Sequence, residues 1–300
     1  MALIEAGDFR FEVDEAWGRL PEGMRAGVVT GVVADSQDRV YLCQQQQDPP
    51  VLVLDRYGNF LDSWGTGYIV EPHTMYMGPD DVIYLADRGA HVVMKLSVSG
   101  EALLEVGNRG QPSDTGCFED EGVVLRAGGP FNRPTRLSPS PSGHLYASDG
   151  YRNCRVHRFT ADGQLVASWG RPGGDGPGAF FSPHSLWVDG EGRIYVCDRK
   201  NNRIQIFDSE GEFVAQWTNV QLPTDLHIGR DGLFYLAERE SGAATENLLT
   251  VRNDAGNVLA SWTTPRSHQI WPDAHGDIYL VSGAATDASR GLGTKYVKVR

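Results

Sequence analysis

Three histidines of the chain occupy the same position in three apolar runs of the kind that form β-strands. Each of them begins a run that is followed by a glycine turn and a second apolar run, and threonine begins the runs that alternate with them. In chain order, these positions are held by Thr30, His73, Thr135, His184, Thr224 and His268. Three imidazoles with an open fourth position form the ligand set of a catalytic zinc site. The alternation with threonine therefore favours metal binding by His73, His184 and His268 over simple packing.

A second set of residues lies fifteen positions after five of these residues. In chain order they are Gln45, Arg88, Gly150, Arg199 and Arg239. A guanidinium presents its donors as a fork that suits a carboxylate. We expect Arg88, Arg239 and Gln45, together with Arg266 two residues before His268, to contact a small anionic substrate. The alternative is that the arginines pair with acidic neighbours such as Asp87 and Asp198, which would leave the cavity nearly neutral.

Tyr151 follows Gly150 and stands where other repeats carry turn residues. A phenol close to a divalent cation gives up its proton more readily and can then act as a general base. Tyr151 is therefore the expected base. The acidic-Arg pairs at the same position in other repeats are also consistent with turn chemistry and ion pairing between blades, without a role in the site.

The segment 132–207 contains the same pattern twice. Pro134-Thr135 and Pro183-His184 each precede an apolar run, a glycine turn, a second run that ends in Asp, and a third run. Val, Ile, Tyr, Phe and Trp fill the runs, and Asp-Gly, Glu-Gly and Ser-Gly fill the gaps, which predicts a four-stranded antiparallel meander. Such a sheet cannot bury both faces alone, and its radial repetition makes a β-propeller.

The repeat predicts an all-β fold, a six-bladed β-propeller in a single domain over residues 1–300. The blades are expected at 28–65, 70–107, 133–170, 182–217, 222–262, and 266–300 together with 9–17. The N-terminal run is an outer strand without its own blade, so we expect it to complete the last blade and close the ring. Alternate blades of a six-fold ring lie about 120° apart, which would direct the three histidines to the axis. The connection 107–131 is predicted to be a loop, either a surface excursion or a lid.

The net charge of -12 and the lack of a basic patch exclude nucleic acid and anionic membranes as expected partners. No apolar run reaches membrane-spanning length and the N-terminus lacks a signal sequence, so we expect a cytoplasmic protein that acts on a small molecule. No pattern specifies an oligomeric state. The four cysteines are too few and too irregular for a disulfide scaffold or a cysteine-based zinc site, and packing explains Cys43 and Cys197, which occupy equivalent strand positions. The remaining histidines, expected at the surface or between blades, are His91, His144, His157, His227 and His275.

The segments SDGYRNCRV, SPHSL and CDRKNNRIQIF resemble NHL-repeat propellers and, among them, the catalytic core of peptidyl-α-hydroxyglycine α-amidating lyase. The likeness is strongest over residues 134–207. It implies a six-bladed propeller with zinc in its channel, in which Tyr151 is the catalytic base and Arg199 binds the substrate as part of the catalytic set. The metal ligands that it implies are His73, His184 and His268. The reaction of the family cleaves the N–C bond of a carbinolamide and releases an amide and glyoxylate.

Several positions depart from the pattern of the family. Its second arginine is Gln45 here, and Arg88, one blade over, is the candidate to replace it. The methionine beside the third ligand is Arg266, and the acidic calcium ligand is Gln269, which argues against the structural calcium. The half-cystine after the tyrosine is Arg152, so that disulfide is absent. The resemblance thus implies related lyase chemistry on a different hydroxylated substrate, anionic or of carbinolamide type.

Three functional hypotheses are compatible with these patterns. The first is a zinc-dependent lyase, and the second is a metal-dependent hydrolase or hydratase in which the metal activates water and Tyr151 only donates a hydrogen bond. The third is a non-catalytic NHL interaction scaffold, which has no need of the alternating histidines. Three neutral imidazoles suit zinc, and also iron, cobalt or nickel.

Overall fold

The computed structural model of the chain describes residues 2–239, 247–284 and 291–299. Its regular structure is β-strand apart from one 3-10 turn, η1 (Arg199–Asn201), the only helical element among these residues. No helix in the described part of the chain is long and apolar enough to cross a membrane. The chain divides into two compact units, unit 1 (Met1–Ile69 and Thr224–Arg300) and unit 2 (Val70–Pro223).

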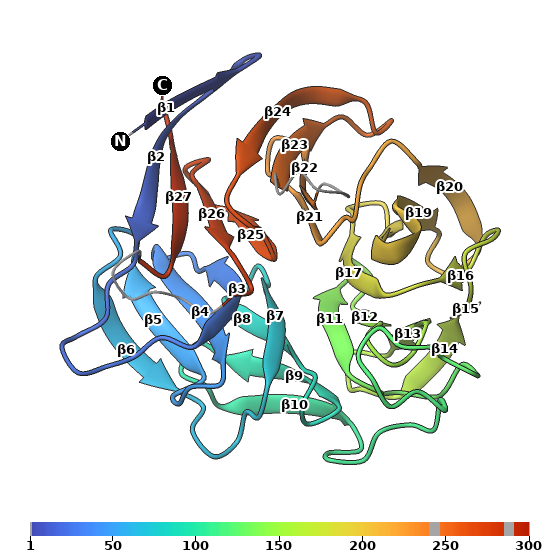
Figure 1. Cartoon of the computed structure of the whole chain (residues 1–300). Coiled ribbons are helices and arrows are strands. Elements are labelled where there is room, and N and C mark those ends of the chain that lie inside the picture. Colours follow the sequence, from blue (N-terminus) through green and yellow to red (C-terminus); the bar gives the residue numbers. More distant parts are fainter. Residues whose placement is uncertain (1, 240–246, 285–290, 300) are drawn as a thin grey trace. The chain divides into compact units, whose positions relative to one another are not determined.

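Unit 2 contains three four-stranded antiparallel sheets, each a meander of consecutive strands. They are β7 (Pro72–Met77), β8 (Val82–Asp87), β9 (Val92–Ser97) and β10 (Ala102–Gly107); β11 (Pro134–Pro139), β12 (Leu145–Asp149), β13 (Arg155–Phe159) and β14 (Leu165–Trp169); and β17 (Pro183–Val188), β18 (Ile194–Asp198), β19 (Arg203–Phe207) and β20 (Phe213–Trp217). A short parallel pair, β15 (Arg171–Pro172) and β16 (Ala179–Phe180), follows the second sheet. The first strands of the three sheets, β7, β11 and β17, lie side by side (Figure 1).

The hydrophobic core of unit 2 lies between neighbouring sheets. Val93 of the first sheet packs in one cluster with Leu137 of the second, and Val156 of the second packs in another with Leu186 of the third. All six residues of β17 are buried, as expected for a strand covered on both faces. Because each sheet buries its faces only against the next one, stacking of the sheets sets the position of each first strand.

Unit 1 contains two four-stranded antiparallel sheets and one five-stranded sheet. The first two are β3 (Val28–Ala34), β4 (Arg39–Gln45), β5 (Val51–Asp55) and β6 (Phe60–Trp64), and β21 (Asp225–Ile228), β22 (Phe234–Arg239), β23 (Asn247–Arg252) and β24 (Val258–Thr264). The third is ordered β1 (Ala2–Ala6), β2 (Phe9–Trp17), β27 (Gly293–Lys298), β26 (Ile278–Val281) and β25 (Gln269–Pro272). The pairing of β2 with β27 means that the N-terminal strand completes the last sheet.

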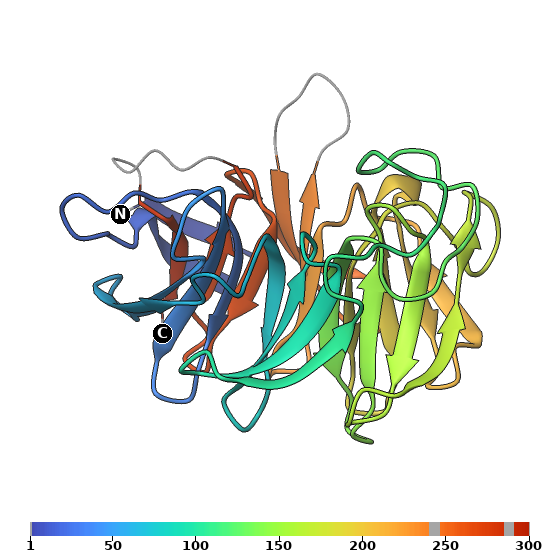
Figure 2. The same cartoon turned by 90° about the horizontal axis from the view of Figure 1, so that it is seen from below.

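The six sheets, three in each unit, give the predicted fold class, a six-bladed β-propeller. The strands fall within the predicted blade ranges to within two residues, and the run 9–17 joins the last blade as predicted. The connection after β10 contains no strand, and Figure 2 shows it, in green, over one end of the strands of unit 2. Strand β1, which pairs outside β2, was not predicted. The single domain over residues 1–300 stays a prediction.

All four cysteines are buried and free; they are Cys43, Cys117, Cys154 and Cys197. The burial of Cys43 and Cys197 agrees with the packing interpretation. Burial raises the pKa of the Cys154 thiol to about 12. His157, expected at the surface or between blades, is fully buried, and its ring centroid lies 5.3 Å from that of Phe131, which packs in the core between the first and second sheets of unit 2. This agrees with a position between blades. Nδ1 of His157 lies 2.7 Å from the hydroxyl of Ser168 on the adjacent strand.

Candidate metal centre

Each predicted metal ligand of unit 2 occupies an irregular position in its strand. The pairing of β7 with β8 skips His73, between Pro72 and Thr74. The pairing of β17 with β18 skips His184 in the same way. A residue that the ladder leaves out in this manner forms a β-bulge, and a bulge re-aims its side chain. The side chains of His73 and His184 therefore need not follow the ordinary alternation of side chains between the two faces of a sheet.

The two imidazoles are close together and fully buried. Their ring centroids are 4.8 Å apart, and both side chains are 0% exposed. Nδ1 of His73 lies 2.7 Å from the carbonyl oxygen of Thr135 on the neighbouring sheet. A carbonyl oxygen only accepts hydrogen bonds, so Nδ1 carries the proton and Nε2 of the neutral ring presents a lone pair. Metal-binding histidines are held in this way, with one nitrogen fixed by an outer partner.

The hydroxyl of Tyr151 lies between the two histidines. It is 3.1 Å from Nε2 of His73 and 3.2 Å from Nε2 of His184. One hydroxyl has one proton and can donate it to only one of these nitrogens at a time. The other contact joins two electron-rich atoms unless a further proton or a cation lies near them. A buried pair of imidazoles beside a phenol is therefore a donor set that fits a transition-metal cation such as zinc.

Gly150 allows Tyr151 to reach this position. A Cβ at Gly150 would lie 2.0 Å from the carbonyl oxygen of Pro183, which is closer than packed atoms approach. Pro183 directly precedes His184, so the close backbone contact brings the residue after Gly150 beside this histidine. Glycine at this position is a steric requirement of the site.

Two guanidinium groups flank the ring of Tyr151. The guanidinium carbon of Arg88, directly after β8, lies 4.8 Å from the ring centroid, and that of Arg199, in η1, lies 5.8 Å from it. Cations at such distances interact favourably with the aromatic face. Positive charge nearby also stabilises a phenolate relative to a phenol. Both arginines thus suit a tyrosine that gives up its proton.

Arg88 is held by carboxylates from two segments. Glu71, just before β7, pairs with Arg88 at 2.6 Å and with Arg133 at 2.8 Å. Asp120, in the connection between β10 and β11, lies 3.7 Å from Arg88 and 2.9 Å from Arg133. Asp87, the acidic neighbour considered from the sequence, instead accepts the backbone N–H of Glu71 at 2.9 Å.

Glu121 supplies the third carboxylate. It pairs with Arg199, and its other oxygen lies 3.1 Å from Nζ of Lys200. Two separate sets of ion pairs are together called the arginine network below. In the first, Glu71 and Asp120 pair with Arg88, Arg133 and Arg152, and in the second, Glu121 pairs with Arg199 and Lys200. Five basic and three acidic side chains leave this network with two positive charges in excess, within a chain of net charge -12. The sequence analysis missed the three carboxylates, and the acidic composition of the connection was the signal for two of them.

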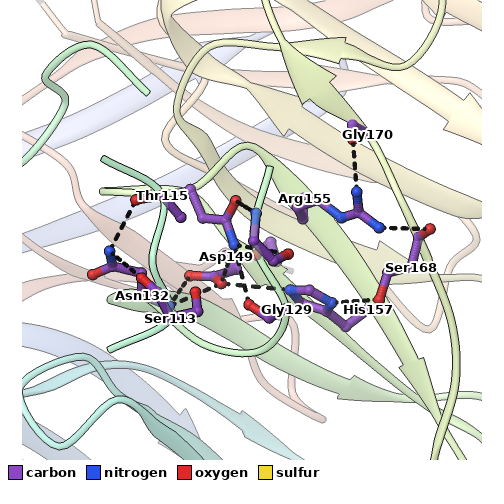
Figure 3. Close-up of polar contacts among 12 residues, drawn as sticks. Ser113, Thr115, Gly129, Asn132, Asp149, Arg155, His157, Ser168 and Gly170 are labelled. Atoms are coloured by element: carbon purple, nitrogen blue, oxygen red, sulfur yellow. Dashed lines mark hydrogen bonds and ion pairs between the residues drawn. The ribbon is translucent and has the colours of Figure 1, made fainter. Parts of the chain in front are cut away.

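A buried polar cluster joins the strand that leads to Tyr151 to the base of the same connection (Figure 3). Asp149, the last residue of β12, is fully buried and accepts the backbone N–H of Asn132 at 3.1 and 3.0 Å. Nε2 of His157 lies 3.4 Å from Asp149. The side-chain amide of Asn132 donates to the hydroxyl of Thr115 at 3.0 Å. Hydrogen bonds therefore join Thr115 and Asn132, which lie in the connection between β10 and β11, to Asp149 at the end of the strand that precedes Tyr151.

His268, the third predicted metal ligand, lies in unit 1. It directly precedes β25 and is 5% exposed. Its Nδ1 is 2.7 Å from the carbonyl oxygen of Thr30. The relation of His268 to Thr30 thus repeats that of His73 to Thr135, with Nε2 again left to present a lone pair.

The other predicted site residues of unit 1 have varied surroundings. Gln45, at the end of β4, is buried, Arg239, at the end of β22, is partly buried, and Arg266 is exposed. The side-chain oxygen of Gln269 accepts the backbone N–H of Val32 at 3.3 Å. Gln269 therefore links two sheets of unit 1 at the position where the resembled family has an acidic calcium ligand.

The comparisons with known proteins agree with the repeat architecture. Residues 180–207 match the family model described as the NHL repeat. The chain resembles NHL-repeat proteins. It is 28% identical to human NHL repeat-containing protein 3 over 242 residues, which are 75% of this chain and 66% of that protein. It is 29% identical over 168 residues to peptidyl-alpha-hydroxyglycine alpha-amidating lyase 1 of Drosophila melanogaster, which covers 52% of this chain and 29% of that protein.

The chain thus spans about two thirds of the first of these relatives and less than a third of the second. A solved structure of streptogramin B lyase superimposes with a TM-score of 0.63 and covers 96% of this chain and 98% of that one. The two are 14% identical, so this likeness shows the shared fold alone. The predicted resemblance to NHL-repeat propellers and to amidating lyases is confirmed.

Proposed function

We propose that the protein is a metal-dependent lyase, with zinc as the expected metal, that acts on a hydroxylated anionic or carbinolamide-type substrate. The observation that carries this proposal is the Tyr151 hydroxyl, which lies 3.1 and 3.2 Å from the Nε2 atoms of His73 and His184. His268 is the proposed third ligand, because it directly precedes the first strand of its sheet and is oriented through Nδ1 by a threonine carbonyl oxygen, as His73 is. The likeness to the Drosophila amidating lyase supports lyase chemistry.

The residues of the chain have separate roles in this reaction. A bound divalent cation would act as a Lewis acid toward the substrate hydroxyl. Tyr151 accepts the proton of that hydroxyl, the carbon–oxygen bond becomes a carbonyl, and the bond to the leaving nitrogen breaks. The leaving group takes up a proton, which Tyr151 is placed to return. Arg88 and Arg199, which flank Tyr151, bind the carboxylate of the substrate.

Three residues of unit 1 complete the proposed substrate contacts. Gln45 and Arg239 lie at the end of the second strand of their sheets, which is where Arg88 lies in unit 2. Arg266 lies two residues before His268. The acidic net charge of -12 supports a small-molecule enzyme over a protein that binds nucleic acid or anionic membranes.

Metal analysis and product analysis test this function. The purified chain should contain about one equivalent of a transition metal, and it should convert an acyl-α-hydroxyglycine to the primary amide and glyoxylate, with no oxygen from labelled water in the acyl product. An acyl carboxylic acid that carries labelled oxygen would favour the hydrolase, and a protein with only a trace of transition metal would contradict both enzymes. Tyr151→Phe should keep its metal and lose roughly a hundredfold in kcat, the scale for a general base.

A further inference from the structure

The connection between β10 and β11 places a carboxylate on Arg199. Glu121 pairs with this guanidinium, lies 3.1 Å from Lys200, and accepts a hydrogen bond from the hydroxyl of Ser182 at 3.0 Å. Arg199 is 6% exposed. A carboxylate that approaches the guanidinium from solution therefore meets a surface that Glu121 already covers in part.

The backbone at this contact is held in an uncommon conformation. Glu121 has φ +59° and Ser182 has φ +60°, in the left-handed region that residues other than glycine seldom adopt. The N–H of Glu121 donates to the carbonyl oxygen of Tyr151 at 2.7 Å. Such conformations persist where surrounding contacts impose them, and they concentrate at functional sites.

The segment that carries Glu121 has little packing of its own. Phe118 and Val123, on either side of it, are 83% and 79% exposed. The preceding buried anchor is Cys117, at 6% exposure. Because the side chains of Phe118 and Val123 face solvent, local opening of the segment breaks the polar contacts of Glu121 and leaves the core of the sheets intact. The carboxylate can therefore leave Arg199 without disturbing the sheets.

We infer that Glu121 is a specificity-determining residue that competes with the carboxylate of the substrate for Arg199. The inference rests on the proposed function for the role of Arg199 as an anion-binding residue. With Glu121 in place, the arginine network already has two positive charges in excess, which attract an anion. Withdrawal of Glu121 raises the excess to three and exposes the guanidinium fork. A neutral ligand gains nothing from this exchange, so the site selects for anions.

Binding of glycolate, a small hydroxy acid, tests the competition. Glu121→Gln in the full chain should bind glycolate with a Kd about tenfold lower than the unaltered protein in isothermal titration calorimetry, the scale of one charge-assisted hydrogen bond. Glu121→Asp, which keeps the charge on a shorter side chain, should also bind more tightly. The matched control is Asp114→Asn, which removes a carboxylate from the same connection at a side chain that is 77% exposed and paired with Arg126; its Kd should not change.

The outcomes separate this inference from the proposed function. An unchanged or higher Kd for glycolate in Glu121→Gln would show that Glu121 only holds Arg199 in place. An equal fall of the Kd in Asp114→Asn would show that the effect comes from the net charge of the protein. Either result overturns the inference, as does a lack of glycolate binding in all variants. The titrations are repeated with the metal removed by a chelator. A protein without metal or lyase activity would contradict the proposed function, while the comparison of Kd values still decides the role of Glu121.

Discussion

The carbonyl oxygen of Thr135 lies 2.7 Å from Nδ1 of His73, and the hydroxyl of the same threonine lies 2.8 Å from the carbonyl oxygen of Pro183. Pro183 directly precedes His184. One threonine therefore orients one histidine through its carbonyl group and contacts the backbone before the next histidine through its hydroxyl. The alternation of threonine and histidine in the sequence has a structural cause: the threonines position the imidazoles.

Removal of one imidazole should empty the proposed metal site and leave the fold intact. His184→Ala should retain the circular dichroism spectrum of the unaltered protein, because the stability of a repeat protein is spread over many units. After dialysis it should retain less than about a tenth of the metal, since three protein ligands are the minimum of a catalytic zinc site. Mass spectrometry of the metal content checks this. The control is His144→Ala, a turn histidine that contacts Ser142 and should leave the metal content unchanged. Full occupancy in His184→Ala would mean that the ligands are misassigned.

Arg199→Lys should weaken glycolate binding although it keeps the positive charge. Lysine lacks the planar fork that binds both oxygens of a carboxylate. We expect the Kd in calorimetry to rise about tenfold, the scale of one lost charge-assisted hydrogen bond. Arg126→Lys, at an exposed guanidinium paired with Asp114, is the matched control. Equal Kd values for Arg199→Lys and the unaltered protein would rule out bidentate binding.

Gly150→Ala should destabilise the chain and displace Tyr151. The new Cβ would lie 2.0 Å from the carbonyl oxygen of Pro183, so the backbone must move. Overpacking of this kind lowers the free energy of unfolding by about 1–3 kcal/mol, which urea denaturation measures. Gly190→Ala is the control, because a Cβ at Gly190 meets no atom within 4 Å. Equal losses in the two variants would show that the close contact is not tight in solution.

Cys154 should resist alkylation in the folded protein. Burial raises the pKa of its thiol from 9.0 to about 12, so at pH 8 the reactive thiolate is scarce in the folded state. Below pH 9 both states hold the thiol proton and this group adds no pH dependence to stability. Between pH 9 and 12 the unfolded state loses the proton first, so stability should fall as the pH rises. Peptide mapping after iodoacetamide treatment at pH 8, with and without urea, checks the expected protection; equal labelling in both conditions would contradict it.

The blades and the two histidines of unit 2 were predictable because alternating apolar runs and glycine turns repeat along the chain. Glu121 was not, because residues 108–131 follow no repeat and composition alone cannot assign an ion pair. The contact of His157 with the buried Asp149 had a signal that was missed. His157 takes the place of Gln205 in the next sheet, whose amide donates to the buried Asp198 at 3.0 Å. Polar residues at equivalent positions of the repeats, each facing the buried aspartate of its own sheet, should therefore be interpreted together. The role of Gly150 also needed the structure, because its close neighbour, Pro183, lies on another blade.

The residue types at the bulges of unit 2 do not determine the register of the sheets. His73, Thr135 and His184 are each skipped by the strand pairing, so none of them contributes to the register of its sheet. A side chain at such a position is exchangeable, since a different residue leaves the neighbouring pairs where they were. Each of these sheets thus has one position near the start of its first strand whose residue type does not set the strand pairing. In unit 2, histidine takes this position in two sheets and threonine takes it in the third, where its carbonyl group orients the imidazole of His73.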